Sequence, residues 1–352
     1  MNKNNKVVST ISSAAMLLLF MLMTACSDSF IFDGEGDCST NVKFVFTSNR
    51  QALQAPSGVG PDAFSASVSS VHLFVFDQET KELVTEKFAS TGELTDGCMM
   101  PLVLPAGEYT LVAWCGLDSN DENNAFELQH TYARGDNDNC HVKMVSDYEP
   151  IHSQKYDALY HGRVSHVSIS NETIGKTIEL PVIKNTNDIA IWIQNPDATF
   201  DNDEFSVSYE DANGVLHFED NSIISEDNRL RYHPHTTSVL NTETEYNGDK
   251  VQSGALISHI SVSRLLDSHK DDAKIVVRNR EGKEVFTLPF IKYVLQMQTF
   301  TDGNKKNDQW YLDCEDTYHC SFYLAGEGDG TWLATRIIIN NWVVVPTQDQ
   351  EF

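Results

Sequence analysis

The sequence has few basic residues, few cysteines and no long apolar run apart from one near its N-terminus. Lys and Arg together number 25 against 51 Asp and Glu, which gives a formal net charge of −26 over 352 residues. So large a negative charge repels nucleic-acid phosphates and anionic lipid headgroups. We therefore expect no nucleic-acid partner, and no membrane contact made through charge.

The chain has seven cysteines and no C-x-x-C pair, which argues against a redox site and a zinc ribbon. Apart from Cys26, six cysteines remain, and in an exported protein an even number permits disulfides. The pair easiest to imagine joins Cys314 and Cys320 in CEDTYHC, as two strand ends facing each other across a tight turn. Isolated buried thiols are the alternative.

Catalytic motifs are also missing, since the chain has neither a nucleophile elbow with its His and acid nor H-E-x-x-H. We expect no catalytic residue, no cofactor and no small-molecule substrate, and hence a structural protein rather than an enzyme. A glycosidase site with paired carboxylates is an alternative that the sequence does not exclude, because among 51 acidic residues some pair will lie about 5 to 10 Å apart.

Several short stretches suggest ligand sites, but a plainer interpretation is favoured for each. His233 and His235 would share a face of a strand, yet a metal site needs further ligands, so we expect exposed loop histidines and no metal. The acidic runs at 117–124 and 135–140 lack the calcium-loop spacing and indicate solvated turns. The glycine-rich run 325–332 precedes a strand, which favours a hairpin turn over a phosphate loop.

The N-terminus has the pattern of an export signal. Lys3 and Lys6 precede an apolar run from Ala14 to Met23. A bilayer of roughly 30 Å needs about 20 apolar residues, so the run is too short to span it, but it suits a signal-peptide core. The following MTAC, which ends at Cys26, resembles a bacterial lipobox with Met in place of the usual Leu.

The lipobox resemblance implies diacylation of the Cys26 thiol, cleavage before it, and acylation of the new amine, with palmitate as a typical chain. Each buried methylene contributes about 0.8 kcal/mol, so two or three chains hold firmly where one holds weakly. Residues 1–25 would be removed, and the mature chain would carry −28, since −26 − 2 = −28 with the two lysines lost. The alternative is a plain signal with an incidental cysteine.

Short alternating segments rich in Val, Ile, Phe and Tyr fill the first half of the chain, which is typical of strands. In GEYTLVAW, Tyr109, Leu111 and Ala113 share one face, opposite Val112 and Trp114. Both faces are apolar, so this strand is expected in the middle of a sheet. The expected strands are 41–46, 71–76, 101–116, 158–170 and 176–184.

A second series of strands opens after KNTND at 184–188. The spacing of about ten residues, with little helical periodicity, favours antiparallel β-sandwiches over a parallel α/β sheet. Short helices or turns are expected only at 256–269 and 290–298. Roughly 325 mature residues exceed what one core supports, so we predict two domains, 26–185 and 186–352. The expected strands are 189–195, 204–211, 214–220, 273–279, 283–290, 309–314, 320–326 and 335–345.

The lipobox, AGEYTLVAW, LPVIKNTNDIAI, YLDCEDTYHCSFYL and the closing IIINNW follow one another along the whole chain. Together they resemble the FimB-like fimbrial anchor family of type V, Bacteroidales-type fimbriae. The resemblance implies an all-β fold of two tandem transthyretin-like antiparallel β-sandwich domains after a lipoprotein signal peptide. It also implies an outer-membrane lipoprotein, a minor fimbrial subunit that anchors the shaft to the cell surface and limits its length.

Two partners are implied: a major fimbrial shaft subunit, bound by strand addition or docking, and the outer membrane, reached through the lipid on Cys26. Shaft subunits of this type resemble lipoproteins whose first strand is removed after an arginine, and Arg50 is a conceivable cut. That cut would discard Cys26, so we expect an anchor to keep its first strand and leave its own groove filled. The tail 346–352 is a candidate donor strand or else a frayed terminus.

The alternative function is a surface lipoprotein, including a fimbrial tip adhesin, that binds a glycan or a host protein.

Overall fold

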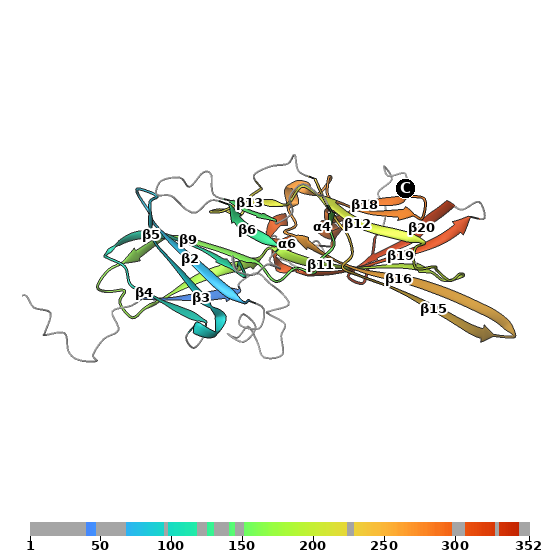
Figure 1. Ribbon diagram of the computed structural model, residues 1–352, viewed down its shortest axis with the longest axis horizontal. Helices are drawn as coiled ribbons and strands as arrows, with labels where there is room; N and C mark the ends of the chain where they lie inside the picture. The colour runs from blue at the N-terminus through green and yellow to red at the C-terminus, as the bar shows by residue number, and fades with distance from the viewer. Residues whose placement is uncertain are drawn as a thin grey trace, which may run out of the picture.

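The computed structural model describes residues 40–46, 68–94, 98–117, 125–129, 141–144, 151–223, 229–297, 307–327 and 331–344. These residues form four β-sheets with two short α-helices and two 3-10 turns, η2 (Thr91–Glu93) and η4 (Asp267–His269) (Figure 1). The predicted all-β fold is confirmed. The transthyretin-like type and the number of domains stay predictions. None of the described helices has both the length and the apolar character needed to cross a bilayer.

Seven strands from the first half of the chain form one sheet at one end of the elongated molecule (Figure 1). Strand β1 pairs in parallel with β10, and the other neighbours in this sheet are antiparallel. In spatial order the strands are β3 (Leu83–Ser90), β2 (Ser70–Asp77), β5 (Gly107–Cys115), β9 (Tyr160–Ile169), β10 (Thr177–Lys184), β1 (Thr40–Phe46) and β4 (Met99–Leu102).

Strand β5 lies inside this sheet and is buried on both faces, as its sequence predicts. Tyr109, Leu111 and Ala113 belong to a core made by the seven-stranded sheet itself. Val112 and Trp114 belong to a larger core that also contains residues of the second half of the chain. The first sheet therefore packs against the rest of the molecule through its second face.

The second half forms a sandwich of a six-stranded and a five-stranded sheet. Its two layers meet where the Phe286 and Phe322 rings lie 4.7 Å apart between centroids. The larger sheet has the order β15 (Thr236–Tyr246), β16 (Asp249–Ser263), β11 (Thr186–Asn195), β19 (Thr317–Glu327), β20 (Thr331–Ile339) and β21 (Trp342–Val344). The smaller has the order β18 (Glu284–Pro289), β17 (Lys274–Asn279), β12 (Phe205–Asp211), β14 (Leu230–Tyr232) and β8 (Ile151–His152).

Strand pairs join the two halves of the chain. Strand β8, from the first half, pairs in parallel with β14. The three-stranded sheet has the order β13 (Val215–His217), β7 (His141–Met144) and β6 (Phe126–Gln129), so it mixes strands of both halves. Only Asn185 separates β10 from β11 at the predicted domain boundary. The division into domains at 185/186 stays a prediction, and hydrogen-bonded pairs cross it.

Two predictions about local structure need correction. The segment 309–314, expected as a strand, belongs to helix α6 (Asp308–Cys314), because the Asn307 side chain caps the helix by accepting from the Trp310 N–H at 2.8 Å. Most of 256–269, a candidate helix or turn, is the end of β16, although η4 follows. Helix α4 (Phe290–Gln296) agrees with the helix option at 290–298.

Two other predicted strands are each divided in the structure. The segment 101–116 contains the end of β4 and all of β5, with a turn through residues 103–106. The segment 335–345 is a hairpin, because Asn340 and Asn341 have φ values of 45° and 70°. Positive φ at both residues of a two-residue loop matches the twist of a tight hairpin, and Asn tolerates it well.

Candidate functional site

The outer face of the six-stranded sheet exposes aromatic and polar side chains side by side. Along β11, Ile189, Ile191 and Ile193 are fully buried toward the sandwich core. Side chains alternate along a strand, so Trp192 and Gln194 point to the other face. Trp192 is 37% exposed there, so an aromatic ring on this face remains accessible to solvent.

Strand register lines up a row of side chains across this outer face. The row holds Leu240, Ala255, Gln194, Tyr323 and Arg336. The Arg336 guanidinium lies 5.7 Å from the centre of the Tyr323 ring, a cation–π contact that fixes both side chains. The row therefore offers apolar surface at its β15 end and an aromatic–cation pair at its other end.

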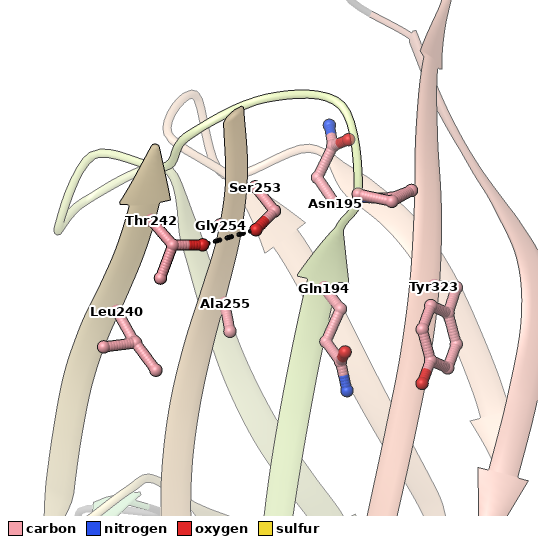
Figure 2. A pocket seen from close by; sticks show the side chains of 9 residues that line it. Gln194, Asn195, Leu240, Thr242, Ser253, Gly254, Ala255 and Tyr323 are labelled. Carbon is pink, nitrogen blue, oxygen red and sulfur yellow. Dashed lines mark hydrogen bonds between the residues drawn. The ribbon is translucent and has the colours of Figure 1, made fainter. Parts of the chain in front are cut away.

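A shallow hollow of about 220 Å³ opens on this face, where the end of β11 lies beside the middle of β15 and the first half of β16 (Figure 2). Its polar groups include the Gln194 amide and the Thr242 and Ser253 hydroxyls, whose oxygens are 2.6 Å apart. The lining residues are Gln194, Asn195, Pro196, Leu240, Thr242, Ser253, Gly254, Ala255 and Tyr323. The hollow thus combines an apolar wall with hydrogen-bonding groups, and it is smaller than the pockets of roughly 300 to 1,000 Å³ that usually enclose small molecules.

Gly254 shapes the edge of the hollow. A Cβ atom at this position would lie 2.8 Å from the Ala198 carbonyl oxygen and 2.9 Å from the Phe200 nitrogen. Only glycine lets the connection between β11 and β12 approach β16 so closely. The connection is also held by Asn241, whose side chain accepts from the Phe200 N–H and donates to the Phe200 carbonyl, both at 2.9 Å.

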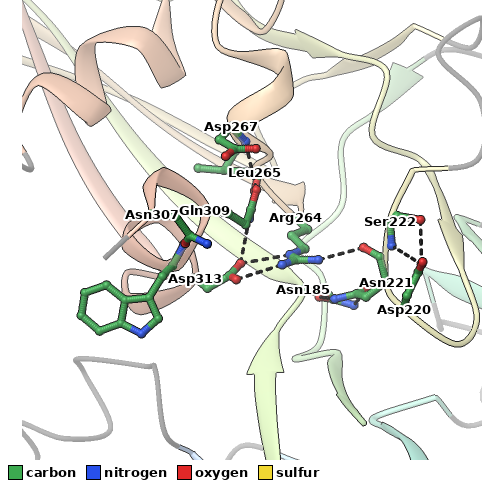
Figure 3. Close-up of polar contacts among 11 residues, drawn as sticks. Asn185, Asp220, Asn221, Ser222, Arg264, Leu265, Asp267, Asn307, Gln309 and Asp313 are labelled. Carbon is green, nitrogen blue, oxygen red and sulfur yellow. Dashed lines mark hydrogen bonds and ion pairs between the residues drawn. The ribbon is translucent and has the colours of Figure 1, made fainter. Parts of the chain in front are cut away.

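A buried polar cluster connects the two halves of the chain (Figure 3). The Arg264 guanidinium donates to both Asp313 oxygens, at 3.0 and 2.9 Å, and to the Asn221 carbonyl at 2.8 Å. The Asn221 and Asn185 side-chain amides exchange two hydrogen bonds of 2.8 Å. Asn185 is the connecting residue between β10 and β11, so the cluster fixes this connection against helix α6.

Further contacts support the same junction. Lys184, the last residue of β10, lies 3.0 Å from the mostly buried Asp316 carboxylate. On the β5 side, the Trp114 indole donates to the Phe218 carbonyl at 3.1 Å and packs against the His161 ring at a tilt of 58°, with the ring centres 4.7 Å apart. Charged and aromatic contacts on both sides therefore hold the seven-stranded sheet against the sandwich.

The candidate histidines lie in a connection between strands rather than on one. His233 and His235 fall between β14 and β15, and both are partly buried. Burial is the main cause that lowers the pKa of each, and the Arg231 charge adds to the effect on His233. Within the described residues, no group of three or more His, Cys, Asp and Glu side chains is placed to hold a metal ion.

The geometry assumed for the Cys314 and Cys320 pair is wrong, because Cys314 ends helix α6 while Cys320 lies within β19. In the structure both are buried thiols, the alternative left open by the sequence. Whether they pair under oxidising conditions stays a prediction. The glycine-rich run 325–332 is a hairpin connection, since Glu327 of β19 pairs with Thr331 of β20.

Several predicted features lie outside the described residues. They are the signal peptide, the lipid attachment residue Cys26, Arg50, the acidic runs at 118–124 and 135–140, and the tail 346–352. The first described strand follows Cys26 closely. Strand β1 lies between β10 and β4, and its Val42 is fully buried in the core of the seven-stranded sheet.

The sequence profile of the fimbrillin-A associated anchor proteins Mfa1 and Mfa2 matches residues 35–347. The chain belongs to this family. The anchor family is one of fimbrial structural proteins and not an enzyme class, and membership associates the chain with a cell-surface fimbrium and with other fimbrial subunits as partners. No curated protein is detectably similar to the chain.

Solved structures share the fold of this anchor-family protein. A candidate adhesin from Bacteroides thetaiotaomicron has a TM-score of 0.71 and 23% identity, covering 88% of this chain and 99% of its own. A candidate polysaccharide-binding protein from the same species has a TM-score of 0.69 and 22% identity, covering 90% and 100%. The fimbrial anchor protein Mfa2 from Porphyromonas gingivalis has a TM-score of 0.60 and 15% identity, covering 87% and 98%.

Sequence reasoning missed the outward row of this anchor-family protein and the junction cluster. The row could have been predicted, because period-two spacing in IAIWIQN puts Trp192 on the same face as the polar Gln194 and opposite the three isoleucines. The junction was not, because Arg264, Asp313 and Asn221 are far apart in sequence and none belongs to a local motif.

Proposed function

We propose that this protein is a lipid-anchored subunit of the outer membrane that holds a fimbrial shaft on the cell surface and limits the shaft's length. The lipid is carried by Cys26, and the major shaft subunit is the protein partner. The observation that supports this role best is the position of β1, which occupies a place inside the seven-stranded sheet between β10 and β4.

Keeping β1 preserves both the fold and the proposed anchor. A cut after Arg50 would remove β1, take the buried Val42 side chain out of the core and expose the facing edges of β10 and β4. Such an open position is a template for a strand of another chain. The same cut would remove Cys26. An uncut chain therefore keeps its lipid and keeps this position closed.

A closed position also accounts for length control. If shaft subunits grow by adding a strand to an open groove, a subunit that fills the equivalent place with its own β1 cannot accept the next one. Its incorporation ends the polymer at the cell surface.

The test is replacement of the lipid-bearing cysteine in the producing cell. Cys26→Ala should move fimbriae from the cell surface into the medium, because no acyl chain then holds the protein in the membrane. Deletion of the whole gene should release fimbriae that are also longer in electron micrographs. The matched control Ser27→Ala leaves the cysteine in place and should keep fimbriae attached. Attached fimbriae of ordinary length in the Cys26→Ala strain would refute the proposal.

A second candidate function is glycan binding at the hollow on the outer sheet face. Exposed Trp192 lies on the same face, next to a row that carries the Gln194 amide, and aromatic faces with nearby hydrogen-bonding groups suit sugar rings. Two structural neighbours carry descriptions as a candidate adhesin and a candidate polysaccharide-binding protein.

Glycan binding predicts that Trp192→Ala and Gln194→Ala abolish retention on an array of surface and host glycans. Phe88→Ala, at an exposed aromatic residue on β3, is the matched control and should bind as the wild type does. No binding by the wild type, or equal binding by all four proteins, would exclude the hollow as a glycan site.

A further inference from the structure

The edges of the described sheets differ in how well they are protected against pairing with another chain. Strand β3 carries Lys87 and has a register shift against β2. Strand β18 ends in Pro289 and has a register shift against β17. Strand β4 has four residues and contains Pro101, and β21 has three residues. Short length, Lys, Pro and bulges are the usual devices that blunt an edge.

Strand β15 has no Lys, no Pro and no bulge, and its charged side chains are those of Glu243 and Glu245. It is the longest of the described edge strands, with eleven residues. Its sequence TTSVLNTETEY contains no Lys, Arg or Pro, and its pairing with β16 continues from Thr236 to Tyr246 without a register shift. Among the described residues, β16 is its sole sheet neighbour. Its other edge therefore presents a long, regular row of backbone N–H and C=O groups.

This edge is also held rigidly. The Asn241 side chain makes two hydrogen bonds with the Phe200 backbone, both of 2.9 Å, at the middle of the strand. Near the tip, the Lys250 ammonium lies 2.7 Å from the Glu243 carboxylate across the hairpin. The Asn241 hydrogen bonds fix the middle of the strand, which reduces the conformational freedom that β15 loses there on pairing.

The place of β15 in the molecule suits contact with a neighbouring subunit. Figure 1 shows the seven-stranded sheet, which contains β1, at one end of the molecule and the tip of the β15–β16 hairpin at the other. The position between β10 and β4 is closed by β1, so a partner has to bind elsewhere.

We propose that the outer edge of β15 takes up an extended segment of the adjoining fimbrial shaft subunit as an added strand. This inference rests on the anchor function proposed above and names the surface that performs it. Leu240 is 55% exposed and calls for an apolar side chain on the incoming segment. Glu245, in the half of the strand nearer the tip, calls for a basic side chain opposite it.

Site-specific photo-crosslinking in fimbriated cells tests the contact. A photoreactive amino acid at Ser238 or Thr242 of β15 should form a covalent product with the shaft subunit after illumination. The same amino acid at Phe88, exposed on the blunted edge strand β3, is the matched control and should form none. Mass spectrometry of the product identifies the partner.

A pair of proline variants tests whether main-chain pairing is responsible. Successive N–H groups of an edge strand point alternately toward and away from its neighbour, so either Thr237→Pro or Ser238→Pro leaves the β15–β16 ladder intact. The variant whose lost N–H points away from β16 should keep the melting temperature of the wild type, and this identifies it. It should lower the yield of the crosslink from Thr242 about tenfold, because the added strand loses a hydrogen bond and meets the proline ring.

The outcomes separate this inference from the anchor function. No β15 crosslink, equal crosslinking from Phe88, or no effect of a proline that preserves melting would overturn the role of the edge. If Cys26→Ala still releases fimbriae in that case, the anchor function stands. A crosslink to a second copy of this chain would also overturn the shaft partner. A crosslink from β15 to a protein outside the fimbria would overturn the role of this edge, and the Cys26→Ala strain would still decide the anchor function.

Discussion

The central strands β5 and β11 occupy similar positions in their sheets but differ in what covers them. Strand β5 is buried on both faces, with Trp114 fully buried on the side that meets the second half of the chain. Strand β11 buries its three isoleucines on one face and leaves Trp192 exposed on the other. A tryptophan in a central strand therefore stabilises the fold in one sheet and remains available for binding in the other.

The largest expected effect comes from the two tryptophans. Trp114→Ala should lower the free energy of unfolding by about 4 kcal/mol, because it empties a fully buried site and removes the indole donor to the Phe218 carbonyl. Trp192→Ala should change it by less than about 1 kcal/mol. Urea denaturation followed by circular dichroism measures both. Equal losses would mean that the outer face of β11 is covered in solution.

The polar contacts allow the same comparison. Arg264→Ala should lower the free energy of unfolding by about 3 kcal/mol, because the largely buried Asp313 carboxylate loses its bidentate partner. The matched control Arg280→Ala breaks surface pairs with Asp201 and Asp203, whose side chains are largely exposed, and should leave the urea midpoint unchanged. A midpoint unaffected by Arg264→Ala would show that the junction cluster does not hold the two halves together.

A smaller effect concerns pH and the covered face of β5. Burial, with a contribution from the Arg264 charge, lowers the pKa of His161 from 6.5 to about 3. The unfolded chain therefore binds a proton between these values that the folded protein does not, so stability falls as pH falls below 6.5. Between pH 7 and 5 this histidine should account for about 2 kcal/mol of lost stability.

The measurement compares urea denaturation at the two pH values in His161→Gln and in the wild type. The variant should lose about 2 kcal/mol less than the wild type on acidification. His259→Gln, on the exposed face of β16, is the control. If His161→Gln and the wild type lose the same stability, His161 is not buried as a neutral ring.

The smallest expected effect is chemical rather than energetic. Burial raises the pKa of the Cys320 thiol, and Cys314 is also buried. Iodoacetamide should therefore leave both unmodified in the folded protein and alkylate both after unfolding without a reductant. Alkylation that requires prior reduction would instead establish the disulfide that the sequence suggests.

Much of the strand pattern could be predicted because period-two alternation survives in the folded chain. The segments around β1, β2, β9, β10 and β11 were predicted within a few residues of their observed bounds. The two apolar faces of β5 also gave its interior position. Alternation follows directly from strand geometry, so a single sequence contains it.

The errors arise where short-range and long-range signals compete. In DQWYLDC the apolar spacing fits a short strand as well as a helix, and the Asn307 cap decides for the helix. In IIINNWVVV the two asparagines are a turn signal within a continuous apolar run. Strand β16 carries polar residues through SHISVS, and these weakened the apolar strand pattern although Ser258, Ser261 and Ser263 are buried in the structure.

The candidate site depends on contacts that no local pattern contains. The hollow is formed by residues of β11, β15, β16 and β19, and its shape requires the close approach of residue 198 to Gly254. The absence of Lys and Pro along β15 is visible in the sequence, but its position at an edge is not. Edge or interior position is a property of the assembled sheet.

The central claim is that the mature protein keeps both its lipid and β1, and the most direct test is mass spectrometry of the protein extracted from the cell envelope. The account predicts an N-terminal peptide that begins with acylated Cys26 and continues through residues 40–46. A mature chain that begins at Gln51, or an unmodified Cys26, would contradict it.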